Sequence, residues 1–221
     1  LGIGGTTSVF SVLQAVLLAP LPYDEPGQLV RFYQQEPDNP ATRHYLTGAH
    51  FSSLRDEAGS FEAVTALANY RETGLDLVRD GRAQRLRMLR VTSDYFHTLR
   101  SGSLRGPGFE RRDEVGARRG SSIGTRRVVL SNGLWRSSFA GDPSVVGSTI
   151  QLSGEPYEVA GITPEGFEDP IAGPVDAWLP YNLTGDTDPE NNSLSAVGRL
   201  RGGLSLEQAQ QELSSLSRSM K

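Results

Sequence analysis

Ser131 is the residue whose position is most suggestive of chemistry, because it follows an apolar run at residues 128–130 and precedes a segment with helical spacing. A serine at such a strand-to-helix turn can act as the nucleophile of a hydrolase. The surrounding sequence LSNGL, however, lacks the glycine before the serine that forms the sharp turn of a GxSxG motif. The sequence therefore favours a helix-capping role for Ser131 over a catalytic one.

No other group of residues has the spacing of a metal or cofactor site. The three histidines, His44, His50 and His97, do not match a ligand pattern such as HxxxH, and the chain has no cysteine. The acidic stretch GDTDPE lacks the glycine and the terminal glutamate of an EF-hand loop. There is also no GxxxxGK[ST] motif for ATP hydrolysis by the P-loop route. We therefore predict that this chain has no catalytic, cofactor-binding or metal-binding residues and is not an enzyme.

The composition is that of a folded globular chain, with 37% hydrophobic and 22% charged residues among 221. The net charge of −4 argues against a nucleic-acid partner, since phosphate binding requires a surplus of lysine and arginine. Residues 100–127 are nevertheless rich in arginine. This segment is either an anion or lipid-headgroup site or a solvated loop, and a solvated loop is the usual outcome for a run of charges. Its arginines are Arg100, Arg105, Arg111, Arg112, Arg118, Arg119, Arg126 and Arg127.

The first 19 residues carry no charge and contain a stripe of small side chains. As a helix they would be about 28 Å long, close to the roughly 30 Å thickness of the hydrocarbon core of a bilayer. Gly4, Ser8 and Ser11 recur at three- and four-residue spacing, as in transmembrane helices that pack closely. An amphipathic N-terminal helix of a soluble protein fits the composition equally well. Pro20 would end the helix in either case.

Strand and helix signals alternate along the rest of the chain. The predicted strands are residues 29–35, a hairpin over 73–92 around Asp80-Gly81, 128–130, a hairpin over 149–162, 175–181 and a strand from 193. Residues 36–48 are predicted to form a loop because proline, asparagine and threonine are frequent there.

Four segments have helical spacing. The first buries one face, made of Phe51, Leu54, Ala58 and Phe61. Residues 61–70 then form either a second short helix or a strand. Ser93 and Ser131 are predicted N-caps of the short helices that follow them. In the last helix Ser205 and Gln208 form a capping box. Its buried face is made of Leu206, Ala209, Leu213 and Leu216.

Five blocks follow one another along the chain: LGIGGTTSVFSVLQAVLLAPLPYDEPGQLV, FSSLRDEAGSFEAVTAL, RVTSDYF, VVLSNGLWRSSFAGDPSVVGSTIQLSGEPYEVAGITPEGF and VGRLRGGLSLEQAQQEL. Together they resemble the MacB-like periplasmic core domain of FtsX/MacB-type ABC transporter permeases, in particular the duplicated orphan permeases of Acidobacteria that lack an ATPase. The pattern LSxGLW…FxGDPxxVG…LxGxPYxVxGxxPxGF is the most specific part. The segment LRSGSLRGPGFERRDEVGARRG departs from the family spacing LGVxPxxGRxF, so the family pattern does not predict the conformation of that loop.

The resemblance implies an α+β fold, a two-lobed extracytoplasmic domain preceded by part of a transmembrane helix. Residues 1–19 would be the C-terminal part of transmembrane helix 1. Residues 29–69 and 193–221 would form a split βαβ lobe similar to the porter modules of efflux pumps, with its last strand missing. Residues 70–192 would form an inserted mixed β/α lobe.

The resemblance also implies a function: a non-catalytic extracytoplasmic (periplasmic) domain that transmits ATP-driven conformational change in export or in lipoprotein, peptide or drug handling. The permease would lie in the bacterial cytoplasmic (inner) membrane, with this domain facing the periplasm or the cell exterior. This chain would need no cofactor, because a separate cytoplasmic ABC ATPase, reached through the rest of the permease, would use the ATP. Further partners would be a second permease copy or pseudo-dimeric half, a periplasmic adaptor and the membrane.

In this hypothesis the linkers near 69–72 and 182–193 are hinges between the two lobes. The alternative is a soluble extracellular binding or adhesion module with no transport role.

Overall fold

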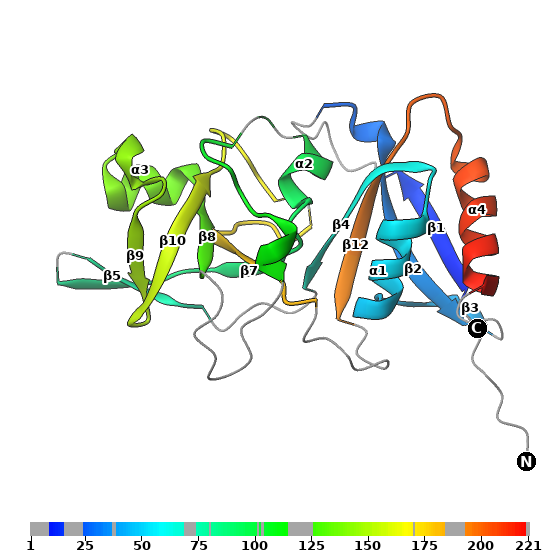
Figure 1. Cartoon of the computed structure of the whole chain (residues 1–221), viewed down its shortest axis with the longest axis horizontal. Helices are drawn as coiled ribbons and strands as arrows, with labels where there is room; N and C mark the ends of the chain where they lie inside the picture. Colours follow the sequence, from blue (N-terminus) through cyan, green and yellow to red (C-terminus); the bar gives the residue numbers. More distant parts are fainter. Residues whose placement is uncertain are drawn as a thin grey trace, which may run out of the picture.

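A single mixed sheet extends through the described part of the chain, and four α-helices pack against it (Figure 1). The computed structural model describes residues 9–15, 24–36, 39–68, 74–79, 81–100, 102, 104–114, 126–169, 171–183 and 193–219. The strands are β1 (Val9–Ala15), β2 (Leu29–Glu36), β3 (Asn39–His44), β4 (Phe61–Ala68), β5 (Asp76–Arg79), β6 (Arg82–Arg85), β7 (Met88–Val91), β8 (Arg127–Leu130), β9 (Thr149–Leu152), β10 (Glu155–Ile162), β11 (Ala177–Pro180) and β12 (Leu194–Leu200). The helices are α1 (Gly48–Glu57), α2 (Tyr95–Leu99), α3 (Asn132–Phe139) and α4 (Leu206–Ser219). The predicted α+β class is confirmed.

The strands follow the order β1-β2-β12-β4-β7-β11-β8-β10-β9-β5-β6, and β3 also pairs with β2. Strands β2, β12 and β4 are antiparallel neighbours, although β12 is separated from both in sequence. We call residues 29–68 and 193–219 the split lobe, and residues 74–183 the inserted lobe. The sheet passes from one to the other where Leu67 of β4 lies opposite Val91 of β7.

In the split lobe, α1 and α4 cover one face of the sheet. Phe51 and Leu54 of α1 and Ala209 and Leu213 of α4 are buried in one cluster with Phe32 of β2. They belong to the helix faces that the apolar spacing predicted, but Phe61, predicted for the face of the first helix, lies in β4, because α1 ends at Glu57. In α4 the predicted capping box is also confirmed. The backbone N–H of Ser205 donates to the side-chain amide oxygen of Gln208 (2.8 Å), and the backbone N–H of Gln208 donates to the hydroxyl of Ser205 (3.3 Å).

Gly198 of β12 allows two aromatic rings to meet beneath the helices. Phe32 and Phe61 pack edge to face with their centroids 4.9 Å apart. A Cβ on Gly198 would lie 2.8 Å from the ring of Phe32 and 2.9 Å from that of Phe61. Glycine at this strand position therefore lets the rings approach the backbone.

The inserted lobe surrounds a second buried cluster under α3. Leu134, Trp135 and Phe139 of α3 pack there against the sheet, with Val128 and Val159 among the buried strand residues. Strand β8 is parallel to β10, and β7 is parallel to β11. The two predicted hairpins are present as β5–β6 and β9–β10, and Gly81 in the first turn has φ +73°, as a hairpin turn of this kind requires.

The N-terminal segment corrects one prediction. Residues 9–15 form strand β1, antiparallel to β2 with Val12 opposite Phe32, and not a helix. An apolar run of this length does not distinguish strand from helix by its periodicity, and the edge of β2 offers backbone groups for pairing. Residues 1–8 and 16–19 of the predicted transmembrane helix lie outside the described residues. Among the described helices, none has the length and apolar character needed to cross a bilayer.

Two smaller predictions were also wrong. Residues 39–44, predicted as loop, form β3, with Gln35 of β2 opposite Arg43; an outer strand can accommodate a proline such as Pro40, because an N–H facing away from the ladder is not needed. Ser93 is not the N-cap of α2, since that position is held by Asp94. Residues 61–68, which were left open between helix and strand, form β4.

Candidate functional site

Ser131 caps α3, as predicted. Its hydroxyl accepts the backbone N–H of Leu134 at 3.1 Å, which satisfies a donor that the first turn of the helix leaves unpaired. Its own backbone N–H donates to the carbonyl of Asp176. Among the described residues no histidine bonds to this hydroxyl, so the geometry supports a cap and not an activated nucleophile.

The histidines do not come together with acidic groups as a metal site. In the part of the chain that the structure describes, no three histidine or acidic residues are grouped so that they could hold a metal ion. His50 lies next to Thr47, whose hydroxyl is 3.0 Å from its Nδ1 atom, and it also contacts Gln34. Burial lowers the pKa of His50. Its role is therefore local packing at the start of α1.

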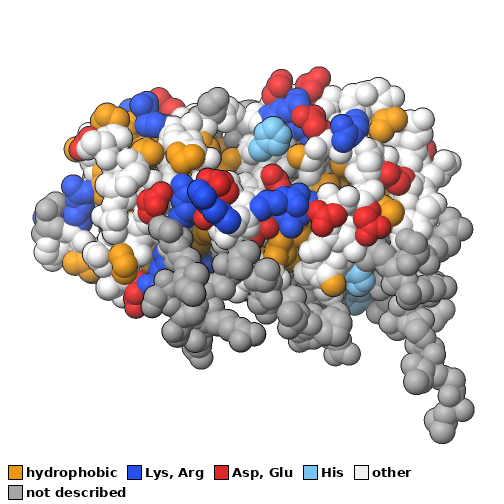
Figure 2. All heavy atoms as spheres, viewed as in Figure 1, with side chains coloured by type: hydrophobic (Ala, Val, Ile, Leu, Met, Phe, Trp, Pro, Cys, Tyr) orange, Lys and Arg blue, Asp and Glu red, His pale blue; other side chains and the backbone are white. Residues whose placement is uncertain are grey.

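The arginines of residues 100–127 contact groups of the chain itself. Arg111 pairs with Asp56, Arg126 with Glu155, and the buried Arg127 with Asp113 at 3.1 Å. Arg118 and Arg119 lie outside the described residues. Figure 2 shows basic and acidic side chains interspersed on one face of the molecule. The described arginines therefore do not form a patch of one sign, as an anion-binding surface requires.

The region where separate parts of the chain converge is the junction between the two lobes. On the sheet face opposite α1 and α4, α2 packs over Leu67 and Val197. Phe96 of α2 contacts Trp178 of β11 edge to face, with centroids 5.5 Å apart, and Phe167 at 5.8 Å. These aromatic side chains of the inserted lobe form one apolar layer with Leu67 and Val197 of the split lobe, and we call this layer the junction.

Glu114 is a buried carboxylate at the junction. One oxygen accepts a hydrogen bond from Arg55 of α1 at 2.7 Å, and the other accepts the backbone N–H of Ser93 at 2.6 Å. Its backbone carbonyl accepts the N–H of Leu183. Glu114 thus bonds the backbone of the serine that was predicted to cap α2, and it links α1 of the split lobe to the inserted lobe. A buried charge with a partner and further hydrogen bonds avoids the cost of unpaired burial.

Arg199 of β12 is the second buried charge at the junction and is 1% exposed. Its Nε donates to the carbonyl of Thr98 at 2.9 Å and its Nη2 to the carbonyl of Leu99 at 3.1 Å. Burial lowers the pKa of the Arg199 guanidinium, and the nearby charge of Arg100 adds to this effect. Arginine stays protonated in proteins nonetheless, so a full positive charge faces the C-terminal end of α2.

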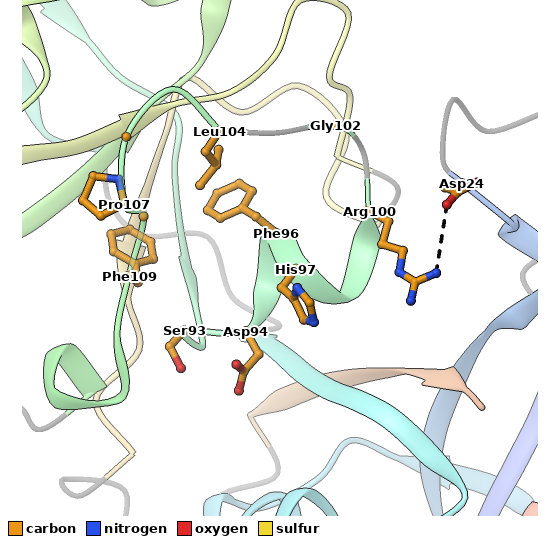
Figure 3. A pocket seen from close by; sticks show the side chains of 12 residues that line it. Asp24, Ser93, Asp94, Phe96, His97, Arg100, Gly102, Leu104, Pro107 and Phe109 are labelled. Atoms are coloured by element: carbon orange, nitrogen blue, oxygen red, sulfur yellow. Dashed lines mark ion pairs between the residues drawn. The ribbon is translucent and has the colours of Figure 1, made fainter. Parts of the chain in front are cut away.

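A cavity of about 580 Å³ lies beside the junction, between α2 and residues 102–109 (Figure 3). Phe96, Leu104 and Phe109 give it an apolar part, and Arg100 reaches toward Asp24 at its rim with a 4.0 Å separation. Arg100 also pairs with Glu62, and this hydrogen bond lowers the pKa of Glu62. The charge of Arg100 at the rim is therefore already paired within the chain.

A smaller cavity, of about 400 Å³, lies beside the capping serine of α3. Arg87 and Asp176 line it and form a two-point ion pair, with contacts of 2.7 and 2.9 Å. Partial burial opposes ionisation of Asp176, but hydrogen bonds from the side chain and backbone of Arg87 outweigh it and hold the pKa of that carboxyl below its usual value. This pair satisfies its own charges and does not form an acid–base couple.

Sequence reasoning did not single out Arg55, Glu114 or Arg199. Each lies in a segment without a motif, and its partners are far along the chain: 59 residues separate Arg55 from Glu114, and 101 separate Arg199 from Thr98. The one available signal was the arginine within SAVGRL, since a charged residue inside an otherwise buried strand has to find partners.

Comparisons with known proteins agree on the fold. A model of the MacB-like periplasmic core domain matches residues 1–216. No curated protein matches the sequence. The periplasmic region of MacB from Actinobacillus actinomycetemcomitans is similar in structure, with a TM-score of 0.59 and 15% identity over 94% of this chain and 89% of that one. The extracellular domain of the noncanonic ABC-type transporter YknZ from Gram-positive bacteria has a TM-score of 0.54 and 17% identity over 87% of this chain and 94% of that one.

Proposed function

Because the chain belongs to the MacB-like periplasmic core domain family, a family of ABC transporter permease domains, we propose that it is a non-catalytic lever that transmits ATP-driven movement. ATP is hydrolysed by a separate cytoplasmic ATPase, and the movement reaches this domain through the membrane part of the permease. The permease lies in the bacterial cytoplasmic (inner) membrane, with this domain facing the periplasm or the cell exterior. The proposed process is the export of a drug or peptide, or the handling of a lipoprotein.

The proposal that the domain acts as a lever is supported by the contacts that join the two lobes. One sheet crosses from lobe to lobe, and two buried charges, Glu114 and Arg199, bond residues of one lobe to residues of the other. A lever needs internal stiffness, because a displacement at one end is otherwise absorbed within the body. The proposed partners are a second permease copy or pseudo-dimeric half, the ATPase, a periplasmic adaptor and the membrane.

A distance measurement in the assembled permease tests this function. The chain has no cysteine, so Gln211→Cys on the exposed side of α4 gives a single labelling site in this domain. With the permease and its ATPase in lipid nanodiscs, spin labels on the two domains of the assembly should change their separation between the nucleotide-free and the ATP–vanadate states. An ATPase variant that cannot hydrolyse or trap nucleotide is the control and should show no change. An unchanged separation during active ATP turnover would refute the transmission role.

A further inference from the structure

Arg199 bonds two separate segments of the chain to its own strand, β12. Besides the carbonyls of Thr98 and Leu99 in the inserted lobe, its Nη1 donates to the carbonyls of Asp24 at 3.0 Å and Glu25 at 3.3 Å. Residues 24 and 25, which we call the entering segment, directly precede the 3-10 turn at Pro26–Gln28, through which the chain enters β2. The guanidinium itself projects from β12, the strand by which the chain returns to that lobe.

The chemistry of this point requires the planar fork of arginine. Four carbonyl oxygens in two segments accept hydrogen bonds from the three nitrogens of one guanidinium. A single ammonium group cannot reproduce this arrangement. Two of these carbonyls belong to the last turn of α2, where helix carbonyls have no partner within the helix. Within the described part of the chain Arg199 forms no ion pair with a carboxylate; the carboxylates of Asp24 and Glu25 pair with Arg100 instead.

The neighbouring contacts reinforce the same connection. The backbone N–H of Asp24 donates to the carbonyl of Arg100, the residue that ends α2. Arg100 in turn pairs with Glu62 of β4. The entering segment is therefore bound to α2 and to the central strands of the split lobe, with Arg199 as the buried member and Arg100 as the half-exposed one.

We propose that Arg199 is the joint that couples the entering segment at Asp24–Glu25 to both lobes, so that a displacement of this segment moves β12 and α2 together. Arg199 acts here as a positioning residue, because it holds backbone and touches no transported molecule. This inference deepens the proposed function, on which the displacement of the segment rests. The bonding itself is a property of the chain alone and can be tested without transport.

The test uses pulsed electron–electron distance measurements on the 221-residue chain. Cysteines for spin labels are introduced pairwise at three exposed positions, Gly27 next to the entering segment, Gln151 in β9 and Gln211 in α4. A Cβ at Gly27 meets no atom within 4 Å, so the label is tolerated there. Each pair is measured in the parent chain, in Arg199→Met, which keeps an apolar stem but donates no hydrogen bond, and in Arg199→Lys.

We expect Arg199→Met to lose the single narrow distance distribution for the 27–151 and 27–211 pairs, while the 151–211 pair stays narrow because the sheet still joins the lobes. Arg199→Lys should give an intermediate broadening of the first two pairs. Arg201→Met is the matched control, since the Arg201 side chain, on the same chain segment, donates to the carbonyl of Gly59 within the split lobe; it should leave all three distributions narrow. Gly198→Ala controls for lost stability and should not broaden the pairs selectively.

Unchanged 27–151 and 27–211 distributions in folded Arg199→Met would overturn the joint. Broadening of all three pairs, or equal broadening in Gly198→Ala, would also overturn it, because the residue would then support the fold as a whole. If Arg199→Met does not fold, the same comparison is made with Arg199→Lys, where unchanged distributions overturn the joint. None of these results involves an ATPase or a membrane, so they leave the transport role standing, whereas failure of the nanodisc experiment leaves the bonding of Arg199 intact.

Discussion

Replacing Glu114 by alanine tests how strongly the buried charges hold the junction. The Glu114 side chain is 4% exposed and that of its partner Arg55 is 11% exposed, so both charges lie largely out of water. The substitution removes two hydrogen bonds, from the Arg55 guanidinium and from the Ser93 backbone, and leaves the buried cation with the more distant and exposed carboxylate of Asp56, 3.9 Å away. Removal of one partner of a buried pair costs about 3–5 kcal/mol. For a chain of this size that corresponds to a fall in the melting temperature of about 6–20 °C.

A double-mutant cycle separates the pair from its surroundings. Arg55→Met keeps an aliphatic side chain but removes the charge, together with the guanidinium whose carbon lies 5.3 Å from the centre of the Phe51 ring. We expect the double variant to be less destabilised than the sum of the two single variants, with a coupling energy of about 1–3 kcal/mol. Urea denaturation of the four proteins measures each free energy of unfolding.

The exposed pair between Arg112 and Glu110 is the control, because it has a similar 2.8 Å contact but lies in solvent. Arg112→Ala should change the free energy of unfolding by less than about 0.5 kcal/mol. The reasoning is refuted if the coupling between residues 55 and 114 falls below about 0.5 kcal/mol, the range of surface pairs.

Two further predictions concern the split lobe. Gly198→Ala should lower the free energy of unfolding by about 1–3 kcal/mol because the new methyl group collides with the rings of Phe32 and Phe61, whereas Gly202→Ala, with open space around its Cα, should change it little; equal effects in urea denaturation would contradict the packing argument. Because burial lowers the pKa of His50, the unfolded chain takes up the proton first, and the free energy of unfolding should fall as the pH drops from about 6.5 through the lower folded pKa. His50→Gln should flatten that part of the pH profile, and an unchanged slope would exclude His50 as its source.

Local signals predicted much of the fold because their causes are local. The capping box of Ser205 and Gln208, the cap at Ser131 and the turn at Gly81 each depend on residues within four positions of one another. The N-terminal strand was not predictable in the same way, because Val9–Ala15 is stabilised by the edge of β2, some twenty residues further on. Apolar character alone supports strand and helix equally in so short a run.

The junction shows the limit of local reasoning more clearly. In the sequence Glu114 lies in the arginine-rich segment 100–127 and matches no motif, yet it is buried and bonded to Arg55 and Ser93, which no spacing rule connects to it. For Arg199 the sequence predicted only that it lies in a strand. What decides the role of such charges is which distant backbone groups the tertiary fold places around them.

The same contacts bear on where the domain can bend. The linkers near 69–72 and 182–193 suggested a hinge between the lobes; residues 69–72 and 184–192 lie outside the described residues. Rotation of one lobe against the other would draw Thr98 and Leu99 away from Arg199 and Arg55 away from Glu114, and would leave buried charges short of partners. Each such loss costs several kcal/mol. Movement of both lobes as one body leaves these bonds intact, so a force applied at Asp24–Glu25 displaces the domain at lower cost than it opens the junction.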